Sequence, residues 1–495
     1  MFNFFKPKIR TRFAPSPTGY VHLGSLRSAL YEYLFAKQNG GDFFLRIEDT
    51  DRSREVPGAA VNLLKVLNWA GIEPNEGVIL ISEGKTVEKG KFGPYTQSQR
   101  LSIYQNHAKQ LIKAEKAYYC FCSPERLENL RQQQEKAKQP TRYDGCCKKL
   151  TPADVKNRLD RGDEYVIRMK MPANREIGFT DLIRGPIKVN SDELDEQVLL
   201  KADGFPTYHL AHVIDDHLMK TTHVIRGEEW LPSTPKHLVL FEYFGWPAPA
   251  YAHLPLILNP DKSKLSKRQG DVAVEDYRDK GYLPEALINY VALLGWNPGT
   301  EQEIFSLPEL IKAFSLAKVH KAGAVFDIKK LDWLNGEYIK KLPNKKFVQL
   351  AWPFLEKTIG AIKDKPLAEK VLLLEQERVS KLSEVGENAG FFFSDQLDYE
   401  AGLLIWKKSD QKSTLKNLGI LKEELTKSAD WSKTGLEKFL LDLIKSRGLT
   451  NGEMLWPLRV ALTGLEKSPP PFDVAGILGQ EKTLARIDGA IKKLN

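Results

Sequence analysis

The stretch FAPSPTGYVHLGS, residues 13–25, decides the fold of this chain. The apolar residues around its start predict a short buried strand over residues 8–14. Pro15 and Pro17 end that strand because proline cannot donate a hydrogen bond to a neighbouring strand. The sequence that follows, SLRSALYEYLFAKQ, places leucines on one face of a helix. The sequence therefore predicts a strand, a Pro/Gly turn that carries His22, and then a helix.

The predicted turn has the features of an anion site. Gly19 and Gly24 permit a tight backbone, and the free N–H groups and the dipole at the start of the helix favour negative charge. Taken alone, however, a histidine two residues before a glycine more often marks an ordinary strand-to-helix loop with a surface histidine. Other parts of the chain have to decide between these two interpretations.

Length and charge limit the classes of function. A chain of 495 residues is expected to form several domains. No apolar run reaches the roughly 18 residues of a membrane span, and residues 1–10 lack the apolar core of a secretory signal, so we expect a cytoplasmic protein with no membrane partner. The formal net charge of +9 favours polyanionic partners such as nucleic acids.

Two predicted strands end in charged residues. The strand at residues 43–47 follows the first helix, which implies a parallel pair with a right-handed crossover. Ligands of parallel sheets bind beyond the carboxyl ends of the strands, so Glu48 is placed to hold an ammonium group, although a solvated charged turn is an equally good interpretation. The strand at residues 223–226 ends in a similar cluster, formed by Arg226, Glu228, Glu229 and Trp230.

Other segments carry weaker signals. Residues 73–93 are rich in glycine and lysine and predict a surface loop, and residues 178–181 predict a turn within an inserted α+β region. From about residue 277 onward the pattern is helical throughout. A lysine-rich helical final third fits an RNA-binding appendage, and it fits equally well any helical domain with a solvated basic face.

The chain's four cysteines lie close together in the sequence, as Cys120, Cys122, Cys146 and Cys147. This number and spacing do not suggest a disulfide framework, so a structural zinc clip or simple burial fits better. The adjacent pair Cys146 and Cys147 is poorly arranged to bind one tetrahedral ion. A three-cysteine site without its fourth ligand and a site with no metal therefore both remain as alternatives.

Two further groups have the composition of ligand sites. Residues 259–274, NPDKSKLSKRQGDVAV, predict a loop whose ammonium groups suit a polyphosphate, with a solvated basic loop as the alternative. In YHLAHVIDDHLM, the residues His209, His212 and Asp216 share one helical face and suggest a metal site. The apolar pattern that runs through the same helix favours a buried core face instead.

The two short signals gain weight from their order. An HxG turn after the first strand and KLSKR after the last strand of a divided sheet resemble the two signatures of the class I aminoacyl-tRNA synthetases. The stretches RIEDTDRSREVPGA, VIRGEEWLPSTPKH, VFDIKKLDWLNGEYI and WPLRVALTG narrow the resemblance to glutamyl-tRNA synthetases of the bacterial type. The resemblance extends in order from about residue 10 to near the C-terminus.

The resemblance implies a fold class and a division into domains. We expect an α/β Rossmann-like catalytic domain with an inserted α+β acceptor-binding domain, followed by an all-α anticodon-binding region. The catalytic domain would comprise residues 1–101 and 207–258, and the insertion residues 102–206. A stem-contact domain with the KLSKR loop would occupy residues 259–343. The helical region would occupy residues 344–495, with an internal boundary near residue 402.

The resemblance also implies an activity. A member of this family would activate L-glutamate with ATP and Mg²⁺ and transfer it to the terminal ribose of tRNA(Glu), with tRNA(Gln) as a second candidate and a monomer as the expected state. A small-molecule nucleotidylyltransferase, which also uses an HxG turn, would leave the helical final third unexplained. A silent RNA-binding paralogue would have no need of the intact signatures.

Site residues carry over from the family position by position. The catalytic signatures match His22, Gly24, Lys264, Ser266 and Lys267. The ATP-binding positions match His22, Gly24, Ser25, Glu229, Trp230, Lys267 and Arg268, with Ser25 where the wider class has a second histidine. The glutamate-binding positions match Arg12, Ala14, Ser16, Glu48, Tyr208, His212 and Arg226. We assign Arg226 to the side-chain carboxylate, because a glutamine would leave its guanidinium partly unpaired.

Two further matches are less complete. In zinc-bearing members the ligands match Cys120, Cys122 and Cys147, but the usual fourth position falls at Lys149, which is not an ordinary zinc ligand. Cys146 could substitute, or zinc could be absent. Arg378 lies near an arginine that reads the anticodon in family members, within the divergent stretch QERVSKLSEV.

Overall fold

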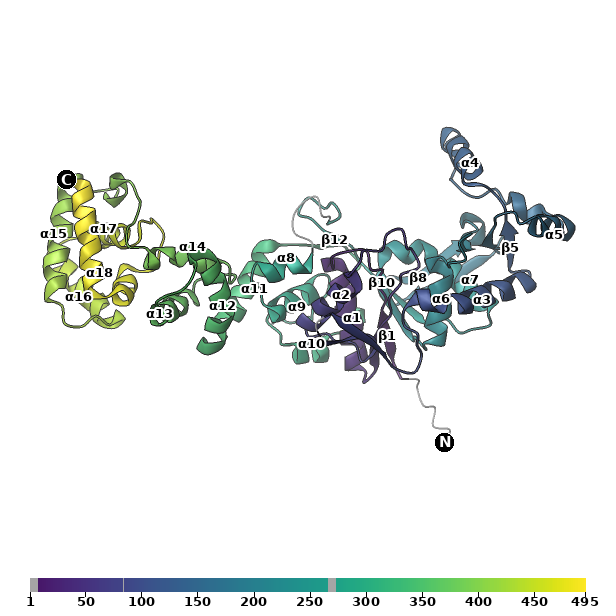
Figure 1. The fold of residues 1–495 in the computed structure, drawn as a ribbon, viewed down its shortest axis with the longest axis horizontal. Helices are drawn as coiled ribbons and strands as arrows, with labels where there is room; N and C mark the ends of the chain where they lie inside the picture. The colour runs from purple at the N-terminus through teal and green to yellow at the C-terminus, as the bar shows by residue number, and fades with distance from the viewer. Residues whose placement is uncertain (1–7, 83, 266–272) are drawn as a thin grey trace. The chain divides into compact units, whose positions relative to one another are not determined.

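The computed structural model describes residues 8–82, 84–265 and 273–495 (Figure 1). The chain divides into two compact units. The first comprises Met1–Arg278 and Pro284–Ile328, and the second comprises Asp279–Leu283 and Lys329–Asn495. Within the described ranges, none of the helices has both the length and the apolar composition that a membrane span requires.

The first unit begins with the strand–helix–strand arrangement that the sequence predicts. The first sheet has the order β1 (Arg10–Phe13), β2 (Asp42–Leu45), β3 (Glu76–Ser82) and β4 (Lys85–Lys89). The strands β1, β2 and β3 are parallel, and β4 pairs antiparallel with β3. The helices α1 (Leu23–Gln38) and α2 (Ala59–Trp69) are the crossovers between the parallel strands.

The surface loop predicted for residues 73–93 is wrong, because this segment contains the hairpin of β3 and β4. Every residue of β4 is exposed, so its lysine and glutamate side chains give no apolar alternation along the strand. The beginning of β3 is fixed by its pairing with the buried strand β2 instead. Tertiary pairing, rather than local pattern, therefore makes this segment a strand.

A second sheet has the order β10 (His223–Gly227), β11 (Ala250–Leu254), β7 (Glu176–Asp181) and β8 (Gly185–Asn190). Its first three strands are parallel, and β7 and β8 form an antiparallel hairpin. The turn predicted for residues 178–181 is wrong, because these residues form the end of β7. Only two residues of β7, Ile177 and Asp181, are buried, so its apolar signal is weak.

The two sheets approach each other at β1 and β10. The backbone N–H of Thr222, just before β10, donates to the carbonyl of Arg10 at 3.0 Å. The backbone N–H of Arg10 donates in turn to the Thr222 hydroxyl at 2.8 Å. The carboxyl ends of β1, β2 and β10 therefore lie near one another, where a parallel α/β sheet binds its ligands.

The inserted region has a small sheet of its own. The strands β5 (Ala117–Cys120), β6 (Val166–Met169) and β9 (Val198–Leu200) pair antiparallel, and α3 (Leu101–Lys113), α4 (Pro124–Lys136) and α5 (Pro152–Asp160) lie between or before them. The predicted α+β character is confirmed. The helices α6 (Tyr208–Leu218) and α7 (Thr234–Tyr243) pack with α3 and this sheet in one buried apolar cluster.

The remainder of the first unit contacts α1 through two of its helices. Its elements are α8 (Val274–Asp279), α9 (Pro284–Leu293), α10 (Leu307–Ala313) and the short parallel pair β12 (Ile257–Leu258) and β13 (Ala324–Val325). From α1, the Tyr31 hydroxyl donates to the carbonyl of Ala292 at 2.9 Å. The expectation of helices throughout from residue 277 fails at β13, because two residues are too few to give a periodic signal.

The regular structure of the second unit is helical throughout its described residues. Its helices are α11 (Ile328–Lys340), α12 (Asn344–Ile359), α13 (Lys365–Glu375), α14 (Glu384–Ala389), α15 (Gln411–Lys427), α16 (Lys433–Ser446), α17 (Asn451–Thr463) and α18 (Pro471–Leu494). Leucines at helical spacing from α15, α16 and α17 meet residues of α18 in one buried core. The predicted all-α region is confirmed.

Candidate active site

The quoted stretch forms the start of α1 as expected. His22 is the N-cap residue, and its Nδ1 accepts a hydrogen bond from the backbone N–H of Gly24 at 3.0 Å. A side-chain acceptor at this position satisfies one of the free N–H groups of the helix and fixes the turn. The ring nitrogen therefore faces the helix N-terminus, where the N–H groups favour an anion.

The basic loop returns to this turn. His22 and Ala273 form an isolated antiparallel bridge, and the backbone N–H of Val274 donates to the carbonyl of Val21 at 2.9 Å. The other end of the loop is fixed where Lys264, whose side chain is exposed, pairs with Leu258. The predicted site residues Ser266, Lys267 and Arg268 lie outside the described residues.

A buried network of charges lies behind the ends of β1 and β2. Arg12 Nε donates to Asp216 Oδ1 at 3.0 Å, and Arg12 Nη1 donates to Glu32 Oε1 at 3.3 Å. Arg46, which is fully buried, donates to Asp216 Oδ1 at 2.8 Å and to Glu48 Oε1 at 2.9 Å. Two arginines therefore share the same aspartate, and Glu48 is held in place by one of them.

The network shifts the protonation of its carboxylates in opposite directions. Burial opposes ionisation of Asp216, but the guanidinium groups of Arg12 and Arg46 outweigh it and hold the pKa of Asp216 below its ordinary value. At Glu48 the effect of burial is larger than that of Arg46 and Arg12, so the pKa of Glu48 is raised. A cationic group of a ligand beside Glu48 would lower this pKa again.

The metal site suggested by His209, His212 and Asp216 does not form. Asp216 is bound by arginines, and the metal-capable group found among the described residues consists of cysteines. The alternative interpretation of this helix is confirmed, since Leu210, Val213 and Ile214 are fully buried. The ring of His212 is also fully buried, and it stacks on Tyr208 with a centroid distance of 4.7 Å.

Arg226 lies near the end of β10 and is only 6% exposed. Its Nη1 donates to the Tyr208 hydroxyl at 2.9 Å, and its Nη2 donates to the Thr234 hydroxyl at 2.9 Å. Its Nε donates to His253 Nε2 at 3.1 Å, and Nη2 also lies 3.3 Å from His237 Nδ1. In the described part of the chain, no carboxylate forms an ion pair with this guanidinium, so its charge is available to a ligand.

A cavity of about 740 Å³ joins several of the predicted residues. Ser16, Glu48 and Tyr208 line it from the catalytic sheet and from α6. Other lining residues come from the inserted region and include Arg168 and Lys201. Three of the seven predicted glutamate positions therefore line a space that also borders the insertion.

The remaining predicted positions do not line this cavity. Ala14 follows β1 and is half-buried. Glu229 is exposed in the 3₁₀ turn after β10, and Trp230 in the same turn lies against Tyr208 with a ring-centroid distance of 4.0 Å. Ser25 lies in the first turn of α1. Arg12 does not line the cavity, because its guanidinium is bound to Asp216 and Glu32.

Sequence reasoning missed several residues of the site. Gln97, in the stretch YTQSQR, lines the cavity and donates to Asp215 Oδ2 at 2.9 Å. Thr234 and His237 lie within the quoted stretch VIRGEEWLPSTPKH but were given no role. His253 lies in a strand that carries no motif, so only the register of β11 against β10 reveals it.

Known proteins resemble the chain over its whole length. The family described as tRNA synthetases class I (E and Q), catalytic domain, matches residues 8–333, and an anticodon binding domain family matches residues 346–491. A glutamate–tRNA ligase of Clostridioides difficile is 48% identical over 486 residues, which are 97% of this chain and 98% of that protein. The chain belongs to the glutamate–tRNA ligase family.

Other relatives of this family agree. A glutamate–tRNA ligase of Alkaliphilus metalliredigens is 46% identical over 492 residues, which are 97% of this chain and 98% of that protein. The crystal structure of a glutamate tRNA ligase from Elizabethkingia meningosepticum in complex with its amino acid has a TM-score of 0.87 and 40% identity, and the match covers 99% of this chain and all of that one. The predicted Rossmann-like class I fold is confirmed.

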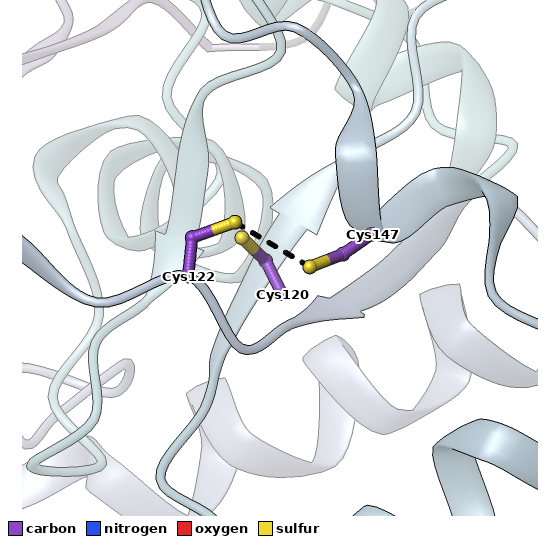
Figure 2. A group of neighbouring side chains, drawn as sticks. All are labelled: Cys120, Cys122 and Cys147. Carbon is purple, nitrogen blue, oxygen red and sulfur yellow. Dashed lines mark hydrogen bonds between the residues drawn. The ribbon is translucent and has the colours of Figure 1, made fainter. Parts of the chain in front are cut away.

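Three of the four cysteines form a cluster in this family member. The sulfur atoms of Cys120, Cys122 and Cys147 lie within 4.8 Å of one another and point toward a common centre (Figure 2). Cys146 is exposed and lies outside the cluster. The hydroxyl of Tyr143 lies 3.4 Å from both Cys120 Sγ and Cys122 Sγ.

Donors surround the three sulfurs. Arg168 Nε donates to Cys120 Sγ at 3.3 Å, and Arg126 Nη1 donates to Cys122 Sγ at 3.5 Å. The backbone N–H of Phe121 donates to Cys147 Sγ at 3.4 Å. Thiolates are the form of cysteine that binds zinc. Against the effect of burial, hydrogen bonds from Tyr143 and Arg168 hold the pKa of Cys120 below its ordinary value, whereas burial and the neighbouring thiols raise the pKa of Cys122. Lys149, the aligned fourth position, is exposed.

In the second unit, Arg378 follows α13 and its side chain is 38% exposed. Its Nε lies 3.7 Å from Glu375 Oε1. Arg459 on α17 lies close enough for Arg378 to affect it, since burial and the charge of Arg378 lower the pKa of Arg459. Arg459 belongs to the quoted stretch WPLRVALTG but was given no role. Two arginines therefore lie near one another in the family's anticodon-binding region.

Proposed function

We propose that the protein activates L-glutamate with ATP and transfers it to the 3′-terminal ribose of tRNA(Glu), releasing AMP and pyrophosphate. The observation that carries this proposal is Arg226, a buried guanidinium surrounded by four neutral acceptors. A buried cation without a counterion favours an anionic ligand. Glutamate has a side-chain carboxylate that could supply this negative charge, whereas glutamine does not.

Glu48 provides the complementary charge in the same site. It lines the cavity while Arg46 holds one of its oxygens, so the other oxygen can accept a hydrogen bond from the α-ammonium group. Tyr208 and Ser16 line the space between, and Ala14 and His212 lie close to them. Arg12 would contribute positive charge behind the substrate while it remains bound to Asp216. The site thus offers the carboxylate of Glu48 to the ammonium group of glutamate, and the guanidinium of Arg226 to its side-chain carboxylate.

The nucleotide would lie at the start of α1. His22, Gly24 and Ser25 would hold phosphate oxygens at the helix N-terminus, and Glu229 and Trp230 would bound the adenosine. Lys264 would approach from the basic loop, together with Ser266, Lys267 and Arg268, which lie outside the described residues. Mg²⁺ would accompany the phosphates. Catalysis would consist of positioning the two reactants and stabilising the charge that develops on the phosphates.

The proposed activity also implies a tRNA partner and a role for each domain. The net charge of +9 supports a polyanionic partner, and we propose tRNA(Glu), with tRNA(Gln) as a second candidate. The insertion at residues 102–206 would bind the acceptor arm. Residues 259–343 would contact the stem, and residues 344–495 the anticodon arm, with Arg378 among the contacts. The protein would act as a cytoplasmic monomer.

We further propose that the cysteine cluster binds one structural zinc ion through Cys120, Cys122, Cys147 and the hydroxyl of Tyr143. The four groups fit because Tyr143 lies against two of the three sulfurs. Three thiolates and a phenolate would give the bound ion a negative net charge, which Arg126 and Arg168 beside the sulfurs would offset. Zinc would act here as a clip between β5 and residues 143–147.

Aminoacylation assays test the catalytic proposal. Purified protein should charge tRNA(Glu) with glutamate and not with glutamine, and parallel reactions with tRNA(Gln) decide whether it is a second substrate. The variant Arg226→Gln should lose about 100-fold or more in kcat/KM for glutamate, because a charged hydrogen-bonding partner of the carboxylate is removed. Lys85→Gln, which removes an exposed positive charge from β4, is the control. Unchanged glutamate kinetics in Arg226→Gln would contradict the assigned role.

A further inference from the structure

Two buried side chains that belong to none of the sequence motifs form a chain of hydrogen bonds with Arg226. In the parallel register of β10 and β11, Arg226 lies opposite His253, and Asp181 ends the next strand, β7. The side chains of His253 and Asp181 are fully enclosed. We propose that Asp181 and His253 are positioning residues that orient Arg226 toward the side-chain carboxylate of the amino-acid substrate, an inference that rests on the proposed function.

The hydrogen bonds fix the tautomer of His253. A guanidinium has donors and no acceptor, so the bond from Arg226 Nε to His253 Nε2 at 3.1 Å requires a lone pair at Nε2. The ring proton must therefore be at Nδ1, where it is donated to Asp181 Oδ2 at 2.7 Å. The carboxylate thus selects the one neutral tautomer that can accept from Arg226.

Asp181 is held as an anion by other donors as well. Its Oδ1 accepts from the backbone N–H groups of Ile183 at 2.9 Å and Arg184 at 2.8 Å, and its Oδ2 accepts from the backbone N–H of His253 at 3.1 Å. Burial opposes its ionisation, but the hydrogen bonds from His253 and these N–H groups hold the pKa of Asp181 below its ordinary value. Burial also lowers the pKa of His253, which keeps the ring neutral.

The imidazole between the two charges matters for specificity. A direct ion pair between Arg226 and an aspartate would neutralise the guanidinium and weaken its preference for an anionic ligand. A neutral ring orients the guanidinium while leaving its charge for the substrate, and Asp181 is stabilised by the hydrogen bond from His253 together with those from backbone N–H groups. The arrangement can therefore hold Arg226 rigidly and still discriminate glutamate from glutamine.

Two substitutions at residue 253 test separately the contact of the ring with Arg226 and its contact with Asp181. In His253→Gln, the amide oxygen can replace Nε2 as the acceptor from Arg226. In His253→Asn, the shorter amide can still donate to Asp181 but does not reach Arg226. We expect His253→Asn to raise the KM for glutamate about tenfold or more. His253→Gln should stay within about threefold of the wild type, and the KM for ATP should change little in either variant.

A substitution at Asp181 tests the tautomer itself. In Asp181→Asn the amide oxygen would accept from the backbone N–H groups, so the amide nitrogen would face His253 Nδ1 and drive the ring proton to Nε2. That proton would oppose the Nε–H of Arg226, and the KM for glutamate should rise at least tenfold. In the His253→Gln background the same substitution should have an effect under threefold, because a glutamine amide has no tautomer to select.

Aminoacylation of tRNA(Glu), with glutamate and ATP varied separately, measures these effects. Equal glutamate KM values in wild type and His253→Asn, or an equal effect of Asp181→Asn in both backgrounds, would overturn the positioning role. A parallel rise in both KM values would show a structural role only and would also overturn it. If His253→Asn does not fold, the Asp181→Asn comparison decides. Absence of glutamate charging by the wild type would instead contradict the proposed function.

Discussion

His22 and Ala273 face each other across an antiparallel bridge. The N-cap of the first helix is therefore fixed beside the far end of the basic loop, about 250 residues later in the chain. Glu275 strengthens the contact, since its Oε1 lies 3.4 Å from the backbone N–H of Val21. Two signals that are individually weak in the sequence thus meet at one place, where a nucleotide could be bound from two sides.

The contact between the His22 turn and the end of the basic loop predicts that Lys267→Ala slows the activation of glutamate. Loss of an ammonium group that stabilises developing phosphate charge should slow glutamate-dependent and tRNA-dependent pyrophosphate exchange by about 100-fold or more. Affinity for tRNA(Glu), measured by filter binding, should remain within about twofold. Loss of one lysine removes only a small part of the positive charge that binds the tRNA backbone. Lys85→Ala, an exposed position on β4, is the control. A large loss of tRNA binding by Lys267→Ala would argue against the assigned role.

Glu48→Gln should affect glutamate and leave ATP unaffected. The glutamine oxygen can still accept from Arg46, so the local fold is retained. The anionic partner of the substrate ammonium is lost, and the KM for glutamate should rise about 10- to 100-fold. Steady-state aminoacylation with each substrate varied measures both values, and Glu55→Gln, exposed nearby, is the control. An equal rise in the KM for ATP would contradict the assignment of Glu48 to the ammonium group.

The sequence predicted much of the fold, because its decisive signals are local. The turn at His22, the parallel pair of β1 and β2 and the helical second unit all follow from proline, glycine and apolar spacing. The hairpin of β3 and β4 could not be predicted in this way, because the lysine-rich strand β4 is exposed along its whole length. Its position depends on pairing with residues that are distant in the sequence.

The site was predicted only in part for a similar physical reason. Motifs identified Glu48, Tyr208 and Arg226, which line the cavity or lie beside it. They did not indicate that Asp216 is shared by Arg12 and Arg46, nor that His253 faces Arg226. Those relations arise from the register of neighbouring strands and from burial, and both are set by the tertiary fold.

The shared aspartate predicts how stability depends on pH. Asp216→Asn removes the counterion of two buried arginines and should destabilise the protein by about 3–5 kcal/mol at pH 7. The folded-state pKa of Asp216 is lowered, so its contribution is fully present above its unfolded value near 3.9 and is lost as pH falls toward the folded value. Urea midpoints should therefore differ between variant and wild type by a constant amount from pH 5 to 8. A deficit that grew below pH 4 would contradict this account.

The cysteine cluster predicts different results for two adjacent residues. Cys147→Ser removes one of three clustered sulfurs and should abolish stoichiometric zinc, measured by metal analysis of the purified protein. Cys146→Ser, one position away and exposed, should retain it and serves as the matched control. Tyr143→Phe should lower the affinity for zinc about 10- to 100-fold in competition with a chromogenic chelator. Full zinc in Cys147→Ser, or none in the wild type, would show that the three sulfurs are buried together without a metal.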